Sequence, residues 1–172
     1  MSLSVLITGA GGFLGGHVCN ELDRHGEYNV IRVDGRHVCD LRDLAATADL
    51  FTSVNPDYVI HLAARVGGIG ANMASPATFW HDNLAMGLSI LAASKHIKRK
   101  LVIVGTTCGY PEKPLTIPFP EEELFDGYPE PTNAPYGIAK RCIFCGARAY
   151  RQQNGLNISL LIPTNLYGPN DS

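Results

Sequence analysis

A glycine-rich turn directly after a short apolar run constrains the fold of this chain more than any other feature. Val5-Leu6-Ile7 is followed by Thr8-Gly9-Ala10-Gly11-Gly12-Phe13-Leu14-Gly15, and a helical period continues over residues 13–25. The glycine spacing is G-x-x-G-x-x-G rather than the G-x-G-x-x-G of the standard dinucleotide fingerprint. Glycine lets a backbone turn tightly and approach a pyrophosphate, whose charge is then held at the helix N-terminus. The pattern therefore predicts a cofactor-phosphate site at Gly9, Gly12, Phe13, Leu14 and Gly15.

The rest of the chain alternates short apolar runs with longer segments of helical period. The apolar runs, each typical of a buried strand, cover residues 30–34, 58–62, 101–104 and 158–162. The helical segments cover residues 41–53, 76–96 and 136–153. Apolar strands alternating with helices predict an α/β fold with a doubly wound parallel sheet of the Rossmann type, covered on both faces. The ligand of such a sheet is expected beyond the carboxyl ends of its strands.

Length and composition fit one soluble domain. The 172 residues suffice for one core and are too few for two, so we interpret residues 1–172 as a single NAD(P)-binding domain. A net charge of −2 lacks the basic surface of proteins that bind nucleic acid or an anionic membrane. No apolar run approaches the ~20 residues of a membrane span. The N-terminus has no signal-peptide pattern, so a cytoplasmic location is the default expectation.

The five cysteines are an odd number, and we interpret them as free thiols. Cys142 and Cys145 have C-x-x-C spacing, but no second Cys/His pair follows them. We therefore predict that the chain holds no metal.

Charged residues at the end of the second apolar run bear on the choice of cofactor. Asp34 follows the glycine turn by about twenty residues, where an acid accepts the adenosine ribose hydroxyls and favours NAD(H). Arg32 and Arg36 flank it, and an arginine there can pair with the 2′-phosphate of NADP(H). The sequence leaves this choice open. Asp40 and Leu41 are placed to meet the adenine edge, although Asp40 is equally suited to cap a helix.

A Y-x-x-x-K motif opens the last helical segment. Tyr136 and Lys140 are one turn apart and share a helix face. A free tyrosine, with a pKa of about 10, is a poor acid–base catalyst near neutrality. A lysine ammonium one turn away stabilises the phenolate and lowers that pKa, which makes proton exchange with a carbonyl oxygen feasible. We therefore predict a catalytic pair.

Three further stretches carry a family resemblance together with the Y-x-x-x-K segment. They are residues 61–72 (His-Leu-Ala-Ala-Arg-Val-Gly-Gly-Ile-Gly-Ala-Asn), residues 105–108 (Gly-Thr-Thr-Cys) and residues 163–169 (Pro-Thr-Asn-Leu-Tyr-Gly-Pro). Through them the chain resembles the extended short-chain dehydrogenase/reductases, and within these the nucleotide-sugar 3,5-epimerase/4-reductases. The resemblance covers essentially the whole chain. It implies an NADP(H)-dependent oxidoreductase and isomerase that converts GDP-4-keto-6-deoxy-D-mannose to GDP-L-fucose.

The resemblance also implies roles for single residues. Thr106 takes the place of the family's catalytic Ser/Thr and would hydrogen-bond the C4 carbonyl, and Tyr136 would donate a proton to that oxygen. Cys108 matches the epimerisation acid/base at C3 and C5; the alternative is a small apolar filler at a strand end. Lys140 would also bind the nicotinamide ribose. Further residues are implied to bind the cofactor (Ala63, Ala64, Pro163, Asn165) or the substrate (Thr107, Asn165). Asn83 is implied to orient the cofactor side of the site; the alternative is an ordinary hydrogen-bonding residue of a helix.

Two parts of the family pattern are missing from this sequence. The family pairs its cysteine with a histidine shortly after the Asn-Leu-Tyr-Gly-Pro segment, and none of the six histidines lies there. Members also carry a C-terminal substrate domain. We therefore expect a fragment that keeps part of its cofactor binding and has very weak or no turnover. Relatives dimerise through the helices at residues 76–96 and 136–153, so a homodimer is a further hypothesis.

Other functions compete with this interpretation. A simple nucleotide-sugar 4-epimerase does not need Cys108. A 4,6-dehydratase needs an acid pair directly after the catalytic threonine, where this chain has Thr107-Cys108-Gly109. A non-catalytic NAD(P)-binding protein typically loses the tyrosine or the lysine, and both are here.

Overall fold

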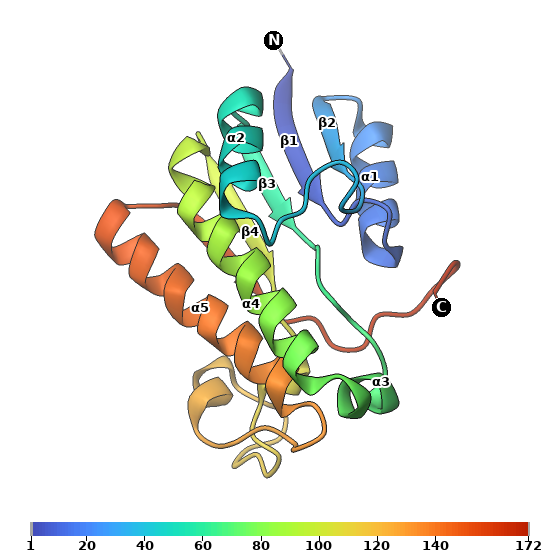
Figure 1. Cartoon of the computed structure of the whole chain (residues 1–172), viewed down its shortest axis with the longest axis vertical. Helices are drawn as coiled ribbons and strands as arrows, with labels where there is room; N and C mark the ends of the chain where they lie inside the picture. Colours follow the sequence, from blue (N-terminus) through green and yellow to red (C-terminus); the bar gives the residue numbers. More distant parts are fainter. Residues whose placement is uncertain (1, 172) are drawn as a thin grey trace.

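The order of the strands decides where a ligand can bind. The computed structural model describes residues 2–171, and within them five parallel strands form one sheet in the order β2-β1-β3-β4-β5 (Figure 1). All four pairs of neighbours are parallel, which confirms the predicted doubly wound sheet. The strands are β1 (Leu3–Thr8), β2 (Tyr28–Val33), β3 (Tyr58–His61), β4 (Lys100–Val104) and β5 (Ile158–Leu161).

The helices follow the predicted segments closely. They are α1 (Phe13–His25), α2 (Leu44–Val54), α3 (Ile69–Ala74), α4 (Pro76–Ala93) and α5 (Ala134–Asn154). Short 3₁₀ turns at Ser94–His96, Thr107–Gly109 and Glu121–Phe125 complete the structure. The pattern did not predict α3 or the 3₁₀ turns, which are too short to show a period of 3.6. Within residues 2–171, no helix combines the length and apolarity that a membrane crossing requires.

The helices lie on opposite faces of the sheet. In Figure 1, α1 lies beside β1 and β2, whereas α2, α4 and α5 form a layer on the other side. Under that layer the core includes Leu6, Val59, Ile103 and Phe51, all completely or almost completely buried. Val5 and Ile7 alternate with Leu6 and instead pack with Cys19 of α1. The period of two along β1 therefore supplies both layers.

The sheet is not covered along its whole width, contrary to the expectation of two complete faces. The α1 cluster reaches β3 through Ile60, and Val102 in β4 is only partly buried. Leu161 in β5 is 50% exposed. Within the described residues, the face of β4 and β5 that is turned away from α5 therefore has little helical cover.

Helix α5 packs against α4 and the end of β4 through two glycines. A Cβ on Gly87 would overlap Ile143, and a Cβ on Gly105 would overlap the Phe144 ring. Because glycine has no side chain, α5 approaches α4 and the strand end closely. This packing fixes the helix that carries Tyr136 and Lys140.

Helix α2 begins at Leu44, three residues later than predicted, because Asp43 rather than Asp40 caps it. The Asp43 carboxylate accepts hydrogen bonds from Ala45 N and Ala46 N at 2.8 and 3.0 Å. The capping alternative for Asp40 is therefore wrong, and Asp40 instead binds Arg42.

Removing the cap should weaken the fold measurably. Asp43→Ala is expected to lower the free energy of unfolding in urea by about 1 kcal/mol, because two N–H groups lose their acceptor. Asp49→Ala makes the same chemical change at an exposed position of the same helix and should cost less than about 0.5 kcal/mol. Equal losses in the two variants would contradict the capping role.

Candidate functional site

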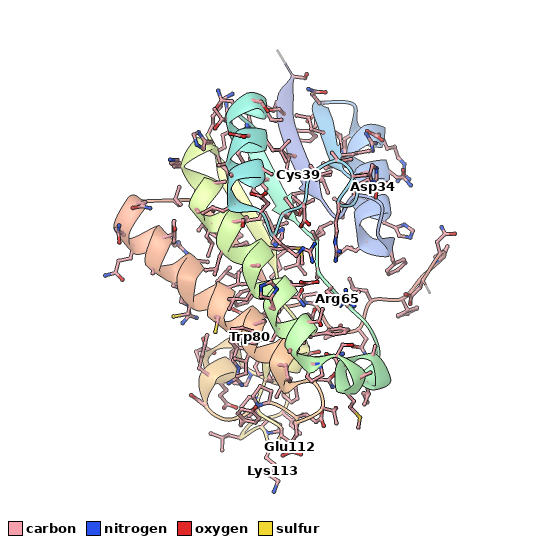
Figure 2. The ribbon with its side chains drawn as sticks, viewed as in Figure 1. Asp34, Cys39, Arg65, Trp80, Glu112 and Lys113 are labelled. Atoms are coloured by element: carbon pink, nitrogen blue, oxygen red, sulfur yellow. The ribbon has the colours of Figure 1, made fainter. Side chains whose placement is uncertain are left out.

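An open cleft of about 1410 Å³ runs along the carboxyl ends of all five strands. It is bordered by the segments after β1 (residues 9–15), β2 (33–36), β3 (62–68), β4 (104–107) and β5 (163–166). The helix after β1 (α1) lies on one face of the sheet, and the long helix after β3 (α4) lies on the other (Figure 1). The switch point therefore lies between β1 and β3, and ligands of doubly wound sheets bind at such a point. Asp34 and Arg65, labelled in Figure 2, come from two of these segments.

Nearly all of the residues that the sequence suggested for the site line this cleft. Those that line the cleft are Gly9, Gly12, Phe13, Leu14, Gly15, Asp34, Arg36, Asp40, Leu41, Ala63, Ala64, Thr106, Thr107, Tyr136, Lys140, Pro163 and Asn165. Cys108 is half-buried and is not among the lining residues.

The glycine turn is held tightly against the sheet. Gly9 has a φ of +72° and donates its N–H to Val33 O at 3.0 Å. A Cβ on Gly9 would lie 2.7 Å from Ala63 N, and a Cβ on Gly15 would overlap Gly9 O. Any side chain at either position would push α1 or the segment after β3 away. These glycines therefore bring the start of α1 to the floor of the cleft.

The N-terminus of α1 suits a pyrophosphate. Its first N–H groups, from Phe13, Leu14 and Gly15, have no partner within the helix, and these residues line the cleft. The N-cap is Gly12, which has no capping side chain, and no acid stands in the first turn. The positive end of the helix dipole therefore faces the cleft without a competing carboxylate in that turn. Main-chain donors, a positive field and the absence of bulk fit the diphosphate of a dinucleotide.

The floor beneath the turn is a buried polar pair. Thr8 Oγ1 lies 2.8 Å from His61 Nδ1 and accepts a hydrogen bond from Ala63 N at 3.3 Å. Burial, and then the charge of Lys140, lower the pKa of His61 to about 3, so the ring is neutral. Thr8 Oγ1 and His61 Nδ1 share one hydrogen bond, whose donor depends on the tautomer of the ring. The pair links the ends of β1 and β3 below the glycine turn.

Thr106 and Tyr136 are brought together by another close approach. Thr106 Oγ1 accepts a hydrogen bond from Cys108 N at 3.1 Å and caps the 3₁₀ turn. A Cβ on Gly137 would overlap Cys108 O, so the first turn of α5 rests directly on this 3₁₀ turn. The motif search did not single out Gly137, although it is the residue directly after Tyr136.

The protonation of Tyr136 and Lys140 differs from the sequence-based expectation. Burial and the nearby Cys108 raise the pKa of Tyr136 to about 12, although the Thr106 hydroxyl lowers it. Lys140 Nζ donates to Val104 O at 3.1 Å, and burial lowers the pKa of Lys140 to about 8. The prediction that Lys140 lowers the pKa of Tyr136 is wrong for this structure: desolvation outweighs the effect of the Thr106 hydroxyl, and Lys140 is not among the groups that shift this pKa.

Several lining residues were missed by the sequence analysis. At the end of the cleft next to Asp40 lie Arg42, Arg65 and the buried Asp82 of α4. These three residues belong to no short motif, and their contacts join segments that are far apart in the chain. Asn83, which the resemblance did suggest, is buried and is not among the lining residues. It accepts a hydrogen bond from Arg65 N and donates to Arg65 O, both at 3.0 Å.

A family model decides the relationship of this chain to known proteins. The model of the NAD dependent epimerase/dehydratase family matches residues 5–172. The chain belongs to this family.

Within residues 2–171, no group of three or more His, Cys, Asp or Glu side chains could hold a metal ion.

Proteins similar to this chain by sequence and by structure include enzymes whose names specify a GDP-sugar. GDP-L-fucose synthase from Dictyostelium discoideum is 36% identical over 98% of this chain, and that from Escherichia coli K12 is 37% identical over 98%. The solved structure of a GDP-mannoheptose C4 reductase from Campylobacter jejuni with NADP bound superposes with a TM-score of 0.92, at 30% identity over 99% of this chain. The chain spans about half of each relative: 53%, 52% and 54%.

The buried lysine should make the stability of the fold depend on pH in a defined direction. The pKa of Lys140 falls from 10.5 to about 8 on folding, so between these values the unfolded chain binds more protons. The stability of the wild type relative to Lys140→Met should therefore rise as pH increases from 8 to 10.5, by about 3 kcal/mol in total. Urea unfolding of both proteins at several pH values measures the two free energies of unfolding. Subtracting one from the other removes the contributions of the other titrating groups, which the two proteins share.

A matched variant separates the effect of burial from that of the residue type. Lys113→Met makes the same change at an exposed lysine, and its stability relative to the wild type should stay nearly constant over the same range. A flat difference for Lys140→Met would show that the ammonium is not desolvated in the folded protein.

Proposed function

We propose that the protein is an NAD(P)-dependent nucleotide-sugar epimerase/reductase that converts GDP-4-keto-6-deoxy-D-mannose to GDP-L-fucose, and that residues 1–172 form its dinucleotide-binding domain. The observation that carries the proposal is a single cleft that is lined both by the uncapped N-terminus of α1 beside Gly12 and by Thr106, Tyr136 and Lys140. The similarity of the chain to GDP-L-fucose synthases supports the choice of substrate. The same similarity supports a place for the chain among the extended short-chain dehydrogenase/reductases.

The protonation states support reduction as the reaction. When bound, a reduced nicotinamide supplies a hydride to the C4 carbonyl carbon of the sugar. With a pKa of about 12, Tyr136 is protonated at neutral pH and can donate its proton to the C4 oxygen. In this proposal, Thr106 hydrogen-bonds the same oxygen. With a pKa of about 8, Lys140 carries a proton at neutral pH yet releases it readily, which suits a group that reprotonates the tyrosine.

The position of Cys108 favours a second candidate function. In the proposal it exchanges protons at C3 and C5, which the neighbouring carbonyl acidifies. However, it does not line the cleft, and this favours a C4 reductase without epimerisation, as the name of the Campylobacter jejuni relative describes. The two candidates share the dinucleotide site and Tyr136, and they differ only in the role of Cys108.

The cofactor is a nicotinamide dinucleotide in either case. Family resemblance favours NADP(H), and NADP is bound in the reductase from Campylobacter jejuni. Asp34, at the end of β2, favours NAD(H). The residues at the adenosine end of the cleft therefore decide between the two forms.

Solvent deuterium distinguishes the two functions. With substrate and reduced cofactor in D₂O, the whole protein should form product that carries deuterium at C3 and C5. Cys108→Ser should lose this deuterium and still reduce C4, because Thr106 and Tyr136 remain. Tyr136→Phe should lower the rate of reduction by a factor of about 10² to 10⁴, since it removes the proton donor. Mass spectrometry and NMR of the product report both effects.

The controls make each outcome informative. Cys142→Ser replaces an exposed cysteine of α5 and should change neither readout. Reduction by the wild type without deuterium would replace the first candidate with the C4 reductase. Full reduction by Tyr136→Phe would contradict both.

We also propose that the protein forms a homodimer through α4 and α5. Helix α4 exposes two large apolar side chains, Trp80 (labelled in Figure 2) by 42% and Leu88 by 54%, which a dimer would bury. Light scattering should give twice the monomer mass for the wild type, whereas Leu88→Glu should give a monomer. A monomeric wild type would refute the dimer.

A further inference from the structure

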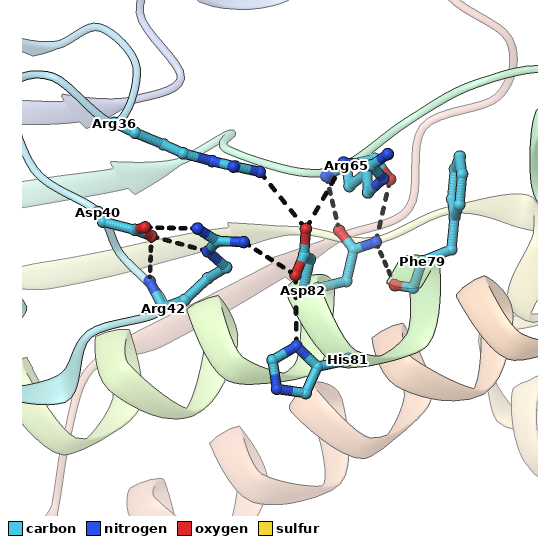
Figure 3. A network of polar contacts seen from close by, with 8 residues as sticks. Arg36, Asp40, Arg42, Arg65, Phe79, His81 and Asp82 are labelled. Carbon is cyan, nitrogen blue, oxygen red and sulfur yellow. Dashed lines mark hydrogen bonds and ion pairs between the residues drawn. The ribbon is translucent and has the colours of Figure 1, made fainter. Parts of the chain in front are cut away.

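One buried carboxylate gathers three guanidinium groups at the adenosine end of the cleft (Figure 3). Asp82, in α4, is only 5% exposed. Its Oδ1 lies 3.3 Å from Arg42 Nη1, and its Oδ2 lies 3.5 Å from Arg36 Nη2 and 3.7 Å from Arg65 Nη1. His81 Nδ1 also lies 3.3 Å from Oδ1. Asp82 is therefore the common partner of cations from the segments after β2 and β3.

Two of the three arginines are also fixed by other contacts. Arg42 binds Asp40 with two nitrogens, Nε to Oδ1 at 2.9 Å and Nη2 to Oδ2 at 2.6 Å. The main chain of Arg65 is bonded to Asn83, and its guanidinium lies over the Phe79 ring, 5.5 Å from the centroid. Arg36 is 59% exposed, and its contact with Asp82 is the one ion pair it makes within residues 2–171. Arg36 is thus the arginine that is best able to move.

Asp34 lies apart from this group of cations. A Cβ on Gly11 would overlap Asp34 Oδ1, so the carboxylate rests on the glycine turn beside the start of α1. Arg32 pairs with Asp23 instead of Asp34. Within residues 2–171, no lysine, arginine or histidine forms an ion pair with Asp34. An exposed, unpaired carboxylate therefore stands where the ribose of a dinucleotide bound at α1 would lie.

The two forms of the cofactor meet this arrangement differently. An unphosphorylated ribose offers hydroxyl donors, and charge-assisted hydrogen bonds to a carboxylate are strong. A 2′-phosphate would bring negative charge against Asp34, and the attraction that could offset this repulsion depends on a free arginine nearby. Asp82 and Asp40 offset two of the three positive charges of Arg36, Arg42 and Arg65, and all three guanidinium groups are held toward Asp82. A phosphate would have to draw Arg36 away from Asp82.

We infer that Asp82 determines the cofactor preference of this chain in favour of NAD(H), because it holds Arg36 against α4 and leaves Asp34 to bind the adenosine ribose. Asp82 is a positioning residue, since it acts through Arg36. The inference rests on the proposed function, because it presupposes that the cleft binds a nicotinamide dinucleotide. It departs from the NADP(H) that the family resemblance implies.

The test is a binding titration of the 172-residue chain with NADH and with NADPH at one ionic strength, followed by the fluorescence of the dihydronicotinamide. The wild type should bind NADH about tenfold more tightly or better, a difference of one decade in Kd. Asp82→Asn frees Arg36 and should shift the ratio of the two Kd values toward NADPH by a similar factor. Adding Arg36→Met to Asp82→Asn should reverse that shift.

Two further variants complete the design. Asp34→Asn removes the negative charge that strengthens the hydrogen bonds to the ribose and repels a 2′-phosphate, so it should weaken NADH binding and strengthen NADPH binding. It tests the inference even where Asp82→Asn does not fold. Asp49→Asn, on the exposed face of α2, makes the same chemical change outside the cleft and should leave the ratio unchanged.

Each outcome has a separate meaning. Binding of NADPH as tightly as NADH by the wild type would overturn the inference and leave the proposed function standing. A folded Asp82→Asn variant with an unchanged ratio would exclude the role of Asp82. Binding of neither dinucleotide would instead overturn the proposed function itself.

Discussion

The close approach of the glycine turn to the end of β3 is the contact on which the rest of the site depends. Gly9 reaches Ala63 so closely that a Cβ would lie 2.7 Å from its nitrogen, and Gly15 seats α1 on Gly9. Beneath them, the buried pair of Thr8 and His61 ties the ends of β1 and β3 together. This approach points the N-terminus of α1 at the switch point of the sheet, so its unpaired N–H groups become part of the cleft.

The chemical end of the cleft depends on burial in a similar way. Gly137 allows α5 to rest on the turn that carries Thr106, and the same packing removes water from Tyr136 and Lys140. Desolvation moves their pKa values apart, to about 12 for Tyr136 and about 8 for Lys140, because it favours the neutral form of both groups. The pair is thus a phenol with a proton to donate and a lysine that holds its proton loosely. Function and stability conflict at Lys140, since its buried ammonium costs folding free energy.

Much of the fold and the site could be predicted from the sequence, and the failures have common physical causes. The runs at β1 to β5 and the helices α1, α4 and α5 show strong local periods, so their positions were confirmed within a few residues. Residues such as Gly9, Asp34 and Tyr136 stand beside strand ends, and parallel strands bring those ends to one edge.

What could not be predicted depends on contacts that are distant in the chain. Asp43 and Asp40 are both acceptable caps by residue type, and only the pairing of Asp40 with Arg42 separates them. Asp82 belongs to no motif, and its partners come from two other segments. The direction of the Tyr136 pKa shift was wrong because local spacing shows where Lys140 lies along the helix and says nothing of how much water remains around either group.

The central claim is that a nicotinamide dinucleotide binds with its diphosphate at the start of α1. Amide ¹H–¹⁵N spectra of the 172-residue chain, recorded during a titration with NADH, test this most directly. The account predicts that the largest shifts fall on Gly11, Gly12, Phe13 and Leu14, with smaller shifts at Ala63 and Ala64. Saturating NADH that leaves the amides of the glycine turn unmoved, or that shifts only residues outside the cleft, would contradict it.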